Sequence, residues 1–366
     1  MNSIGIGELE ATVSEVLETT PFIDIHTHLF APGFGKIGLW GIDELLTYHY
    51  LEAELFRSSS IHPIKYWTLS KTQRADLVWK TLFVENAPVS EATRGVIAVL
   101  QALRLDANTR SLGPLREYFQ DQKLSDHIPR VFKLAGIRQA VMTNDPLDPA
   151  EAAIWNSGVD LGPGFRSALR LDRIINEWDA HWHVIESQGY AVHHDCREET
   201  LSEVRRFLAD WVSRMKPAYM AVSLPDTFFF PVVKDARTTL IREAVLPSCL
   251  EFNLPMALMI GVRRQVNPLL KNAGDAVGKA DLRSLENLCQ EFPDNRFLVS
   301  VLSRENQHEL CVYARKFANV LPFGCWWFLN NPSLVEEITR MRLEMLGMSF
   351  IPQHSDARVL EQVIYK

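Results

Sequence analysis

Short apolar runs alternate with longer amphipathic stretches along most of this chain. This alternation is typical of β/α units, in which a buried parallel strand is followed by a helix that covers it. Eight of the apolar runs are predicted to be strands: Phe22–His26, Arg138–Thr143, Phe165–Leu169, Tyr219–Ser223, Met256–Ile260, Phe297–Val301, Val320–Phe323 and Met348–Ile351. Because a closed (β/α)8 barrel needs eight parallel strands, the pattern predicts an α/β fold of the TIM-barrel type.

The segment between the first two predicted strands, residues 30–136, has helical rather than strand periodicity. Its predicted helices are Ile42–Leu55, Lys71–Phe83, Glu91–Leu103 and Leu112–Lys123. A connection that leaves the C-terminal end of a barrel strand lies on the face where barrel active sites are built. We therefore expect a single barrel domain, residues 1–366, with a mostly helical insertion over its active-site face. A further helix is predicted at Glu198–Met215.

Length and composition are compatible with this fold. The chain has 366 residues, and a (β/α)8 barrel needs about 250, although two smaller domains would also fit the length. Hydrophobic residues make up 47% of the chain and charged residues 23%, which is ordinary for a globular protein. The formal net charge is -7 and no extended Lys/Arg run occurs, so we expect no nucleic-acid and no membrane partner.

The N-terminal segment and the cysteines bear on the location of the protein. The N-terminus is acidic and amphipathic, and it lacks the basic and apolar regions of a secretory signal. No apolar stretch is long enough for a membrane span, which needs about 18 residues. The five cysteines are scattered and form no C-x-x-C motif, which favours free thiols in a reducing compartment. We therefore expect a cytoplasmic protein.

The clearest candidate for chemistry is the sequence His26-Thr27-His28 at the end of the first predicted strand. Residues i and i+2 of a strand point to the same side, so both imidazoles can converge on one metal ion. The alternative is two ordinary histidines near a strand end. A second pair, His181 and His183, falls in a predicted helix, where side chains two residues apart diverge.

An acidic residue follows the last predicted strand, in Ser355-Asp356-Ala357-Arg358. When a barrel closes, its last strand lies beside its first, so Asp356 can reach an ion held by His26 and His28. The alternative is that Asp356 is a helix N-cap, a position that Ser and Asp favour at a strand-to-helix junction. These residues alone leave both interpretations open.

The combination of His-x-His on the first strand with Asp on the last resembles the metal-dependent amidohydrolase superfamily, and within it the uronate (glucuronate) isomerase family. The segments that carry the resemblance occur in the family's order: Asp24–Leu29, His49–Tyr50, Thr143–Asp148, Arg170–Asp172, Ile260–Arg263, Ser303–Asn306, Phe323–Phe328 and Ser355–Arg358. The resemblance extends over about residues 20–366. Members of that family are typically longer, so the resemblance implies a shortened and divergent member.

Carried over position by position, the resemblance implies a metal site and a sugar-acid pocket. His26, His28 and Asp356 would hold one divalent metal ion, with zinc the first candidate and manganese, iron or cobalt also compatible. Asp356, Tyr50 and Arg170 would be catalytic. The substrate would contact His49, Arg304, Trp326, Trp327 and Arg358. Guanidinium groups suit such a substrate because they bind carboxylates bidentately, although arginines also form surface ion pairs and tryptophans also pack in cores.

Two positions depart from the family's pattern. The family has a histidine at the end of the fifth strand, where this chain has Met259, and an aspartate at the end of the fourth, where it has Leu224. A thioether cannot carry a proton and is a poor ligand for zinc-like ions. Asp226, two residues further on, could replace the aspartate after a small loop shift. These losses argue against a binuclear hydrolase site and leave a mononuclear site intact.

Three functions are compatible with these residues. The first is an aldose–ketose isomerase that acts on glucuronate, galacturonate or a related sugar acid through a metal-stabilised enediolate, with Asp356 as proton carrier and Tyr50 as hydrogen-bond donor. The second is a metal-dependent hydrolase, lactonase or decarboxylase. The third is a non-catalytic sugar-acid binding barrel, which Met259 and Leu224 favour. The expected partner is a small-molecule sugar acid, the arginines favour an anionic substrate in both catalytic cases, and a homo-oligomer is compatible with the sequence.

Overall fold

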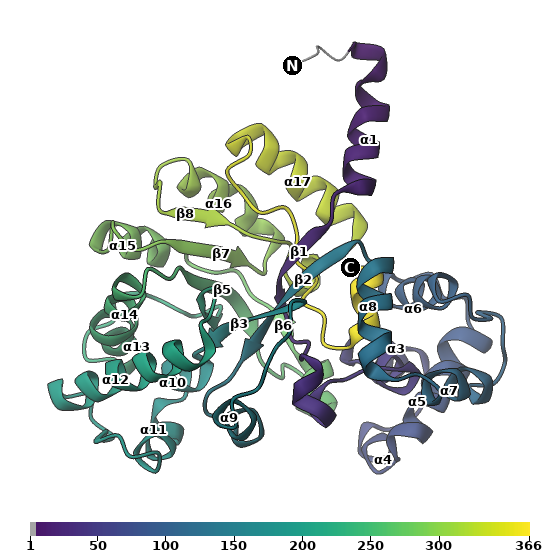
Figure 1. The fold of residues 1–366 in the computed structure, drawn as a ribbon, viewed down its shortest axis with the longest axis horizontal. Helices are drawn as coiled ribbons and strands as arrows, with labels where there is room; N and C mark the ends of the chain where they lie inside the picture. The colour runs from purple at the N-terminus through teal and green to yellow at the C-terminus, as the bar shows by residue number, and fades with distance from the viewer. Residues whose placement is uncertain (1–4) are drawn as a thin grey trace.

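The computed structural model describes residues 5–366. Its centre is a parallel sheet in the order β1-β2-β3-β4-β5-β7-β8, to which a short antiparallel β6 is added beside β5 (Figure 1). The strands are β1 Phe22–Thr27, β2 Ile137–Asn144, β3 Phe165–Arg170, β4 Met220–Pro225, β5 Met256–Arg263, β6 Ala276–Val277, β7 Phe297–Val301 and β8 Val320–Pro322. The predicted α/β fold with a parallel sheet is confirmed. Residues 1–4, which begin the segment where no secretory signal is expected, lie outside the described residues.

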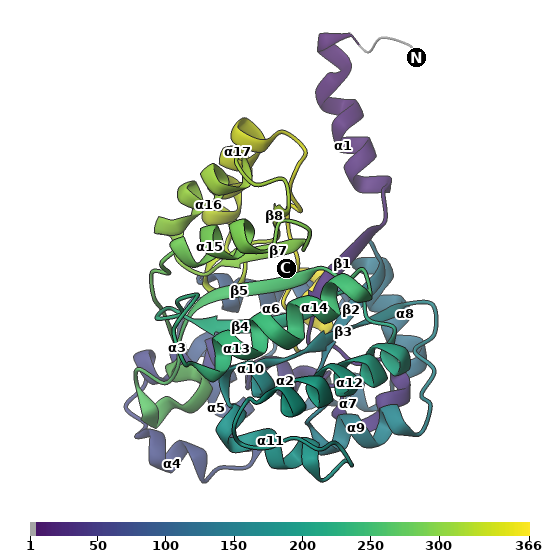
Figure 2. The same cartoon turned by 90° about the vertical axis from the view of Figure 1, so that its left-hand side faces the viewer.

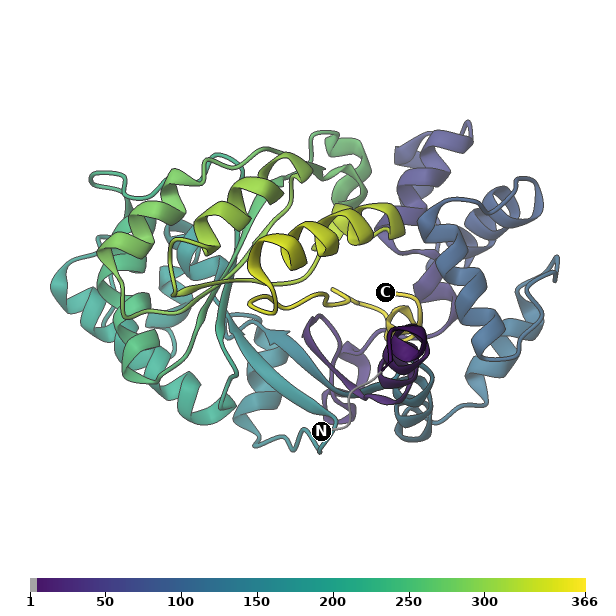
Figure 3. The same cartoon turned by 90° about the horizontal axis from the view of Figure 1, so that it is seen from above.

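Helices cover the outer face of the sheet (Figures 1 and 3). They are α9 Pro149–Asn156, α10 Asp172–Asn176, α11 Trp178–Glu186, α12 Glu198–Met215, α13 Ala236–Leu240, a π-helical turn Ile241–Val245, α14 Leu246–Glu251, α15 Arg283–Glu291, α16 Gln307–Ala314 and α17 Pro332–Leu346. The predicted helix at Glu198–Met215 is α12. The pair His181 and His183 lies in α11, as predicted.

The strands are apolar on both faces because each face packs against something. In β5, Leu258 belongs to the core between the sheet and the outer helices, whereas Ala257 and Met259 belong to the interior core with Tyr219 and Ala221. Strands that are buried on both sides read as continuous apolar runs. This is why seven of the eight predicted strands coincide with strands of the sheet.

The eighth predicted strand, Met348–Ile351, is wrong. Gly347 ends α17 with a φ of 61°, and Met348 beside it is 88% exposed. Only Ile351 pairs with the sheet, through a single parallel bridge to Phe323. Pro352 follows it, and proline has no N–H to continue a ladder.

An irregular segment, residues 351–357, joins the two edges of the sheet instead. The Ile351 N–H donates to the Pro322 carbonyl of β8 over 2.9 Å. At the other edge, the Asp356 N–H donates to the His26 carbonyl of β1 over 3.1 Å. The end of the chain therefore lies beside its first strand, as the barrel prediction requires, without forming a regular strand.

The connection between β1 and β2 is built of helices. They are a 3-10 segment Pro32–Ile37, α2 Ile42–Leu46, α3 His49–Ser58, α4 Pro63–Trp67, α5 Lys71–Trp79, a π-helical turn Lys80–Val84, α6 Glu91–Ala102, α7 Gly113–Gln120 and α8 Leu124–Leu134. The predicted helix Ile42–Leu55 is two helices in the structure, and α4 and α8 were not predicted. These helices share an apolar core of their own, with Leu46, Leu55 and Val78 fully buried.

The first helix, α1 (Leu9–Thr19), projects away from the rest of the molecule (Figures 1 and 2), and none of its residues is buried. Among the described residues, no helix combines the length and hydropathy of a membrane span. All five cysteines are free thiols, as expected.

Candidate metal centre and substrate cavity

Two histidines and one aspartate meet at the C-terminal end of β1. His26 lies in β1 and His28 directly after it. The Nε2 atoms of both rings face the carboxylate of Asp356: its Oδ1 atom is 3.5 Å from His26 Nε2 and 3.2 Å from His28 Nε2. The fold therefore brings Asp356 next to two histidines that precede it by more than 300 positions in the sequence.

Asp356 does not cap a helix. It lies in the irregular segment between Ile351 and Ala357, and the next helical turn, Leu360–Ile364, begins after Val359. Its φ of 52° is in the left-handed region, which non-glycine residues seldom adopt and which aspartate tolerates better than most. The N-cap interpretation is therefore wrong, and the backbone at Asp356 is one of the strained positions that tend to occur at functional sites.

The three side chains fit a divalent cation. One ligand atom from each lies within 4.8 Å of the others. Asp356 Oδ1 is buried and has no hydrogen-bond partner among the described residues, although buried polar atoms are rarely left unpaired. Burial, together with the charge of nearby Arg358, lowers the pKa of His28 to about 3. This imidazole is therefore neutral near pH 7, which is the form that binds metal.

A cavity of about 20 Å³ adjoins the three side chains. Besides Asp356, five residues predicted to act on or contact the substrate line it: His49, Arg170, Trp326, Trp327 and Arg358. A cavity of this size has room for about one water molecule. Side chains around the cavity must therefore move before a sugar acid can enter.

Several buried polar atoms around the cavity have no hydrogen-bond partner among the described residues. They are His49 Nε2, Tyr50 Oη, Trp327 Nε1 and Arg358 Nε. Burial lowers the pKa of His49 well below its ordinary value, and Arg358 lowers it further. Burial raises the pKa of Tyr50 well above its ordinary value, so the phenol keeps its proton. A ligand rich in hydroxyl and carboxylate oxygens would pair these groups.

The arginines of the cavity differ in how far they are already paired. Arg170 forms two parallel hydrogen bonds to Asp172, from Nε over 2.9 Å and from Nη2 over 3.0 Å. Arg264 pairs with Asp275 over 2.6 Å and lies 5.6 Å from the centre of the Trp327 ring. Arg358 forms no ion pair within residues 5–366. Arg358 is therefore the guanidinium most available to an anionic ligand.

Arg304 is not among the residues that line this cavity in the structure. Its side chain is 58% exposed, and its Nη2 atom is 3.0 Å from a carboxylate oxygen of Glu337 on α17. Arg304 begins a 3-10 turn after β7, and its Nε also donates to Glu337 over 3.0 Å. Tyr50 does not line the small cavity either, although its ring stacks on Phe328 with centroids 6.0 Å apart, next to His49.

The two departures from the family's pattern have different structural settings. Met259 is buried in the barrel interior and borders a second small void that His26 and His28 also line. Leu224 points outward into the core under the helices, so Ser223 is the residue of β4 that lines the cavity. Asp226 lies 3.8 Å from the Arg263 guanidinium and does not take the place of an acid at the site.

Four contributors to the site were missed by sequence reasoning. Arg264 and Ser223 line the cavity, Thr143 Oγ1 is 3.0 Å from His28 Nδ1, and Tyr219 Oη is 3.0 Å from His26 Nδ1. Position at the C-terminal end of a strand is a signal that could have identified the first three. Tyr219 precedes its strand and reaches the site through the barrel interior, so no local signal identifies it.

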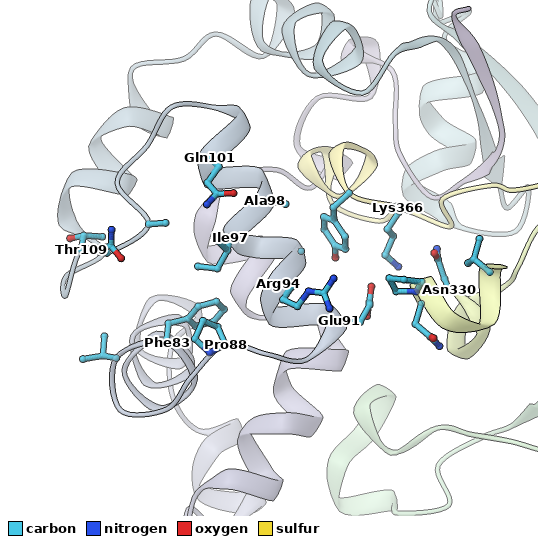
Figure 4. Close-up of a pocket in the computed structure, with 18 of the residues that line it drawn as sticks. Phe83, Pro88, Glu91, Arg94, Ile97, Ala98, Gln101, Thr109, Asn330 and Lys366 are labelled. Atoms are coloured by element: carbon cyan, nitrogen blue, oxygen red, sulfur yellow. The ribbon is translucent and has the colours of Figure 1, made fainter. Parts of the chain in front are cut away.

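A larger cavity of about 900 Å³ lies between α6 and the start of α17 (Figure 4). Figure 4 shows Glu91 and Arg94 of α6 facing Lys366 and Asn330 at one end of this cavity. Lys366 Nζ is also 5.1 Å from the centre of the Tyr50 ring. The wall of the larger cavity therefore contacts the layer of aromatic residues that surrounds the small one.

The sheet is parallel and of the barrel type. At the C-terminal ends of its strands lie a cluster of side chains that suit a metal ion and several guanidinium groups. These features define the class of protein: a barrel with a candidate metal centre for an anionic ligand. An uronate isomerase from Bacillus halodurans C-125 has a solved structure that is 51% identical to this chain, with a TM-score of 0.96. The match covers 99% of this chain and 86% of that one. The chain belongs to the uronate isomerase family.

Two more distant structures share the fold. A uronate isomerase from Thermotoga maritima is 15% identical, with a TM-score of 0.76 over 99% of this chain and 90% of that one. A glucuronate isomerase from Caulobacter crescentus is also 15% identical, with a TM-score of 0.72 over 94% of this chain and 82% of that one. No protein-family model and no curated protein matches the chain.

Proposed function

We propose that this chain is an aldose–ketose isomerase that interconverts a uronate, such as glucuronate or galacturonate, with its keto isomer. The observation that carries the proposal is the 51% identity to a uronate isomerase over 99% of the chain. The convergence of His26, His28 and Asp356 beside an arginine-lined cavity supports it. The same family membership disfavours the hydrolase and the non-catalytic binding barrel.

His26, His28 and Asp356 are the proposed ligands of one divalent metal ion. Two imidazoles and a carboxylate are a common donor set for zinc, and zinc is the metal we propose. When bound, such an ion acts as a Lewis acid toward oxygens of the substrate. The low pKa of His28 keeps its ring in the metal-binding form over the whole neutral range.

The residues around the cavity supply the remaining chemistry. Isomerisation moves a proton between two adjacent carbons and passes through an enediolate. Asp356 is the proposed proton carrier, because its carboxylate is buried and lines the cavity. Arg358 is the proposed partner of the substrate carboxylate, and the protonated Tyr50 phenol a donor to a developing oxyanion.

The helices between β1 and β2 are proposed to act as one inserted unit, residues 30–136, that carries His49 to the site. Their shared apolar core supports this division of the single barrel domain. The free thiols support a cytoplasmic location.

The test is turnover by the purified, metal-loaded protein. Glucuronate, galacturonate and their keto isomers are each incubated with protein whose metal content has been measured, and the other isomer is quantified. We expect turnover in both directions with about one equivalent of metal. Asp356→Asn should lower kcat by about 10²- to 10⁴-fold, whereas Arg304→Ala, a change at an exposed ion pair, should leave it unchanged. Metal-loaded protein that turns over none of these uronates would overturn the proposal.

A further inference from the structure

Each of the two histidines is held by a hydroxyl group from another strand. Tyr219 Oη, just before β4, lies 3.0 Å from His26 Nδ1, and Thr143 Oγ1, in β2, lies 3.0 Å from His28 Nδ1. Both hydroxyls also donate to β1 itself. Tyr219 donates to the Ile25 carbonyl over 2.7 Å, and Thr143 donates to the carbonyl of the residue before His28 over 2.9 Å. In both cases the acceptor is the carbonyl of the residue that precedes the histidine.

These contacts determine where the imidazole protons are. A hydroxyl group has one proton, and in both cases the β1 carbonyl accepts it. Toward the imidazole, each hydroxyl oxygen can then only accept, so Nδ1 must carry the ring proton. In the neutral form of each ring, Nε2 is left as the atom with a free lone pair. Both Nε2 atoms face Asp356 Oδ1, over 3.5 and 3.2 Å.

We infer that Tyr219 and Thr143 are positioning residues that fix both imidazoles in the Nδ1-protonated tautomer and thereby preorganise the site for a cation. This inference deepens the proposed function and rests on the metal site that it includes. Two lone pairs and an unpaired carboxylate oxygen that converge in a buried space repel one another, and a cation relieves this repulsion. Within residues 5–366, neither hydroxyl is hydrogen-bonded to an arginine of the cavity, and neither residue is one of the three proposed ligands.

A variant that lacks either hydroxyl should therefore bind the metal more weakly, although all three proposed ligands are still present. Hydrogen-bond partners of metal-binding histidines typically contribute 10- to 100-fold to metal affinity. For Tyr219→Phe and Thr143→Val we expect a Kd for Zn²⁺ about 10- to 100-fold higher than that of the wild type. Thr143→Ser keeps a hydroxyl and should restore most of the affinity.

Thr27→Val is the matched control. Thr27 lies between the two histidines, is fully buried, and donates from Oγ1 to the Val141 carbonyl over 3.0 Å, but its hydroxyl contacts neither imidazole. A merely structural effect of a lost buried hydroxyl would appear equally in this variant. We expect its Kd for Zn²⁺ to stay within a few-fold of the wild type, and urea denaturation identifies any variant that fails to fold.

The experiment measures the Kd for Zn²⁺ by competition with a chromophoric chelator, and the tautomer of each ring by ¹⁵N NMR of the metal-free protein. The expected result is a protonated Nδ1 on His26 and His28 in the wild type, mixed tautomers for His26 in Tyr219→Phe, and weaker binding in both hydroxyl-free variants. Unchanged tautomers and an unchanged Kd in folded variants would overturn this inference and leave the isomerase proposal standing. A wild type with the expected tautomers that binds no Zn²⁺ would instead overturn the metal site of the proposed function.

Discussion

At the scale of single residues, Arg358 stands apart from the other arginines of the site. Arg170 and Arg264 already have carboxylate partners in Asp172 and Asp275, whereas Arg358 has none in the described part of the chain. Its Nε atom is buried without a hydrogen-bond partner. A substrate carboxylate would supply the missing partner through the bidentate geometry that guanidinium groups favour.

Arg358→Lys is therefore expected to weaken substrate binding strongly. Lysine keeps the charge but loses the planar fork of donors. A hydrogen bond to a charged group contributes about 1.5–3 kcal/mol, which corresponds to an increase in KM of roughly 10- to 100-fold. Steady-state kinetics with a uronate measure this change. Arg304→Lys should leave KM unchanged, and an equal rise in both variants would contradict the assignment.

Single residues also show which parts of the site could be predicted from the sequence. The family motifs identified His26, His28 and Asp356, which the structure brings together. The same reasoning selected Arg304, which lies at the surface, and passed over Arg264. The direction in which a loop side chain points depends on what packs against that loop, and the motif pattern does not contain this information.

At the scale of elements, Gly324, just after β8, controls how closely the chain approaches the histidines. A Cβ atom at this position would lie 2.0 Å from His354 Cδ2. His354 in turn packs against His26, with ring centroids 5.0 Å apart. Gly158, after α9, also has a positive φ, 77° against 64° for Gly324, but nothing lies within 4 Å of its Cβ position.

Gly324→Ala is expected to cost clearly more stability than Gly158→Ala. Both variants carry the penalty of a left-handed backbone, about 1–2 kcal/mol, but only the first also adds an overpacking cost of about 1–3 kcal/mol. Urea denaturation gives the free energy of unfolding for each. We also expect Gly324→Ala to bind metal more weakly, because His354 must shift against His26. Equal destabilisation of the two variants would show that the close approach is unimportant.

Glu151 of α9 links its helix to the end of β2 and makes stability depend on pH. Its carboxylate accepts hydrogen bonds from Asn144 Nδ2 over 2.9 Å and from the Asp145 N–H over 3.2 Å. Burial raises the pKa of Glu151 from 4.5 to about 7. The folded state therefore binds a proton between these pH values that the unfolded state has lost, so the free energy of unfolding falls as the pH rises through this window.

Glu151→Gln removes this pH dependence, because an amide does not titrate and its oxygen can still accept both hydrogen bonds. The variant should be more stable than the wild type at pH 8, by up to about 3 kcal/mol, and of similar stability below pH 4.5. Urea denaturation at pH 4.5 and pH 8 measures the difference. A constant difference at both pH values would refute the raised pKa.

At the scale of the whole molecule, a buried pair connects the helical segment to the end of the chain. His127 of α8 and Glu361 are 2.8 Å apart between Nε2 and Oε1, and both side chains are fully buried. Glu361 also accepts a hydrogen bond from the Gly41 N–H over 3.1 Å. The turn that contains Glu361 follows directly on the segment that holds Asp356 and Arg358.

Glu361→Ala is expected to destabilise the protein by about 3–5 kcal/mol, the typical cost when one partner of a buried pair is removed. It leaves the imidazole of His127 and a backbone N–H without partners. The free energy of unfolding from urea denaturation measures the loss. Glu337→Ala, which breaks the exposed pair with Arg304, serves as the control and should cost no more than about 1 kcal/mol.

The sequence by itself determined the class of fold and identified His26, His28 and Asp356 as candidate metal ligands. Buried strands need apolar runs, and helices need amphipathic ones, so seven strands and the long helix Glu198–Met215 follow from local pattern. The tertiary structure decided how the last segment meets β1, which arginine faces the cavity, and that Tyr219 reaches His26 from the far side of the barrel. These outcomes depend on contacts between distant segments, and the periodicity of a single segment carries no record of the partner against which it packs.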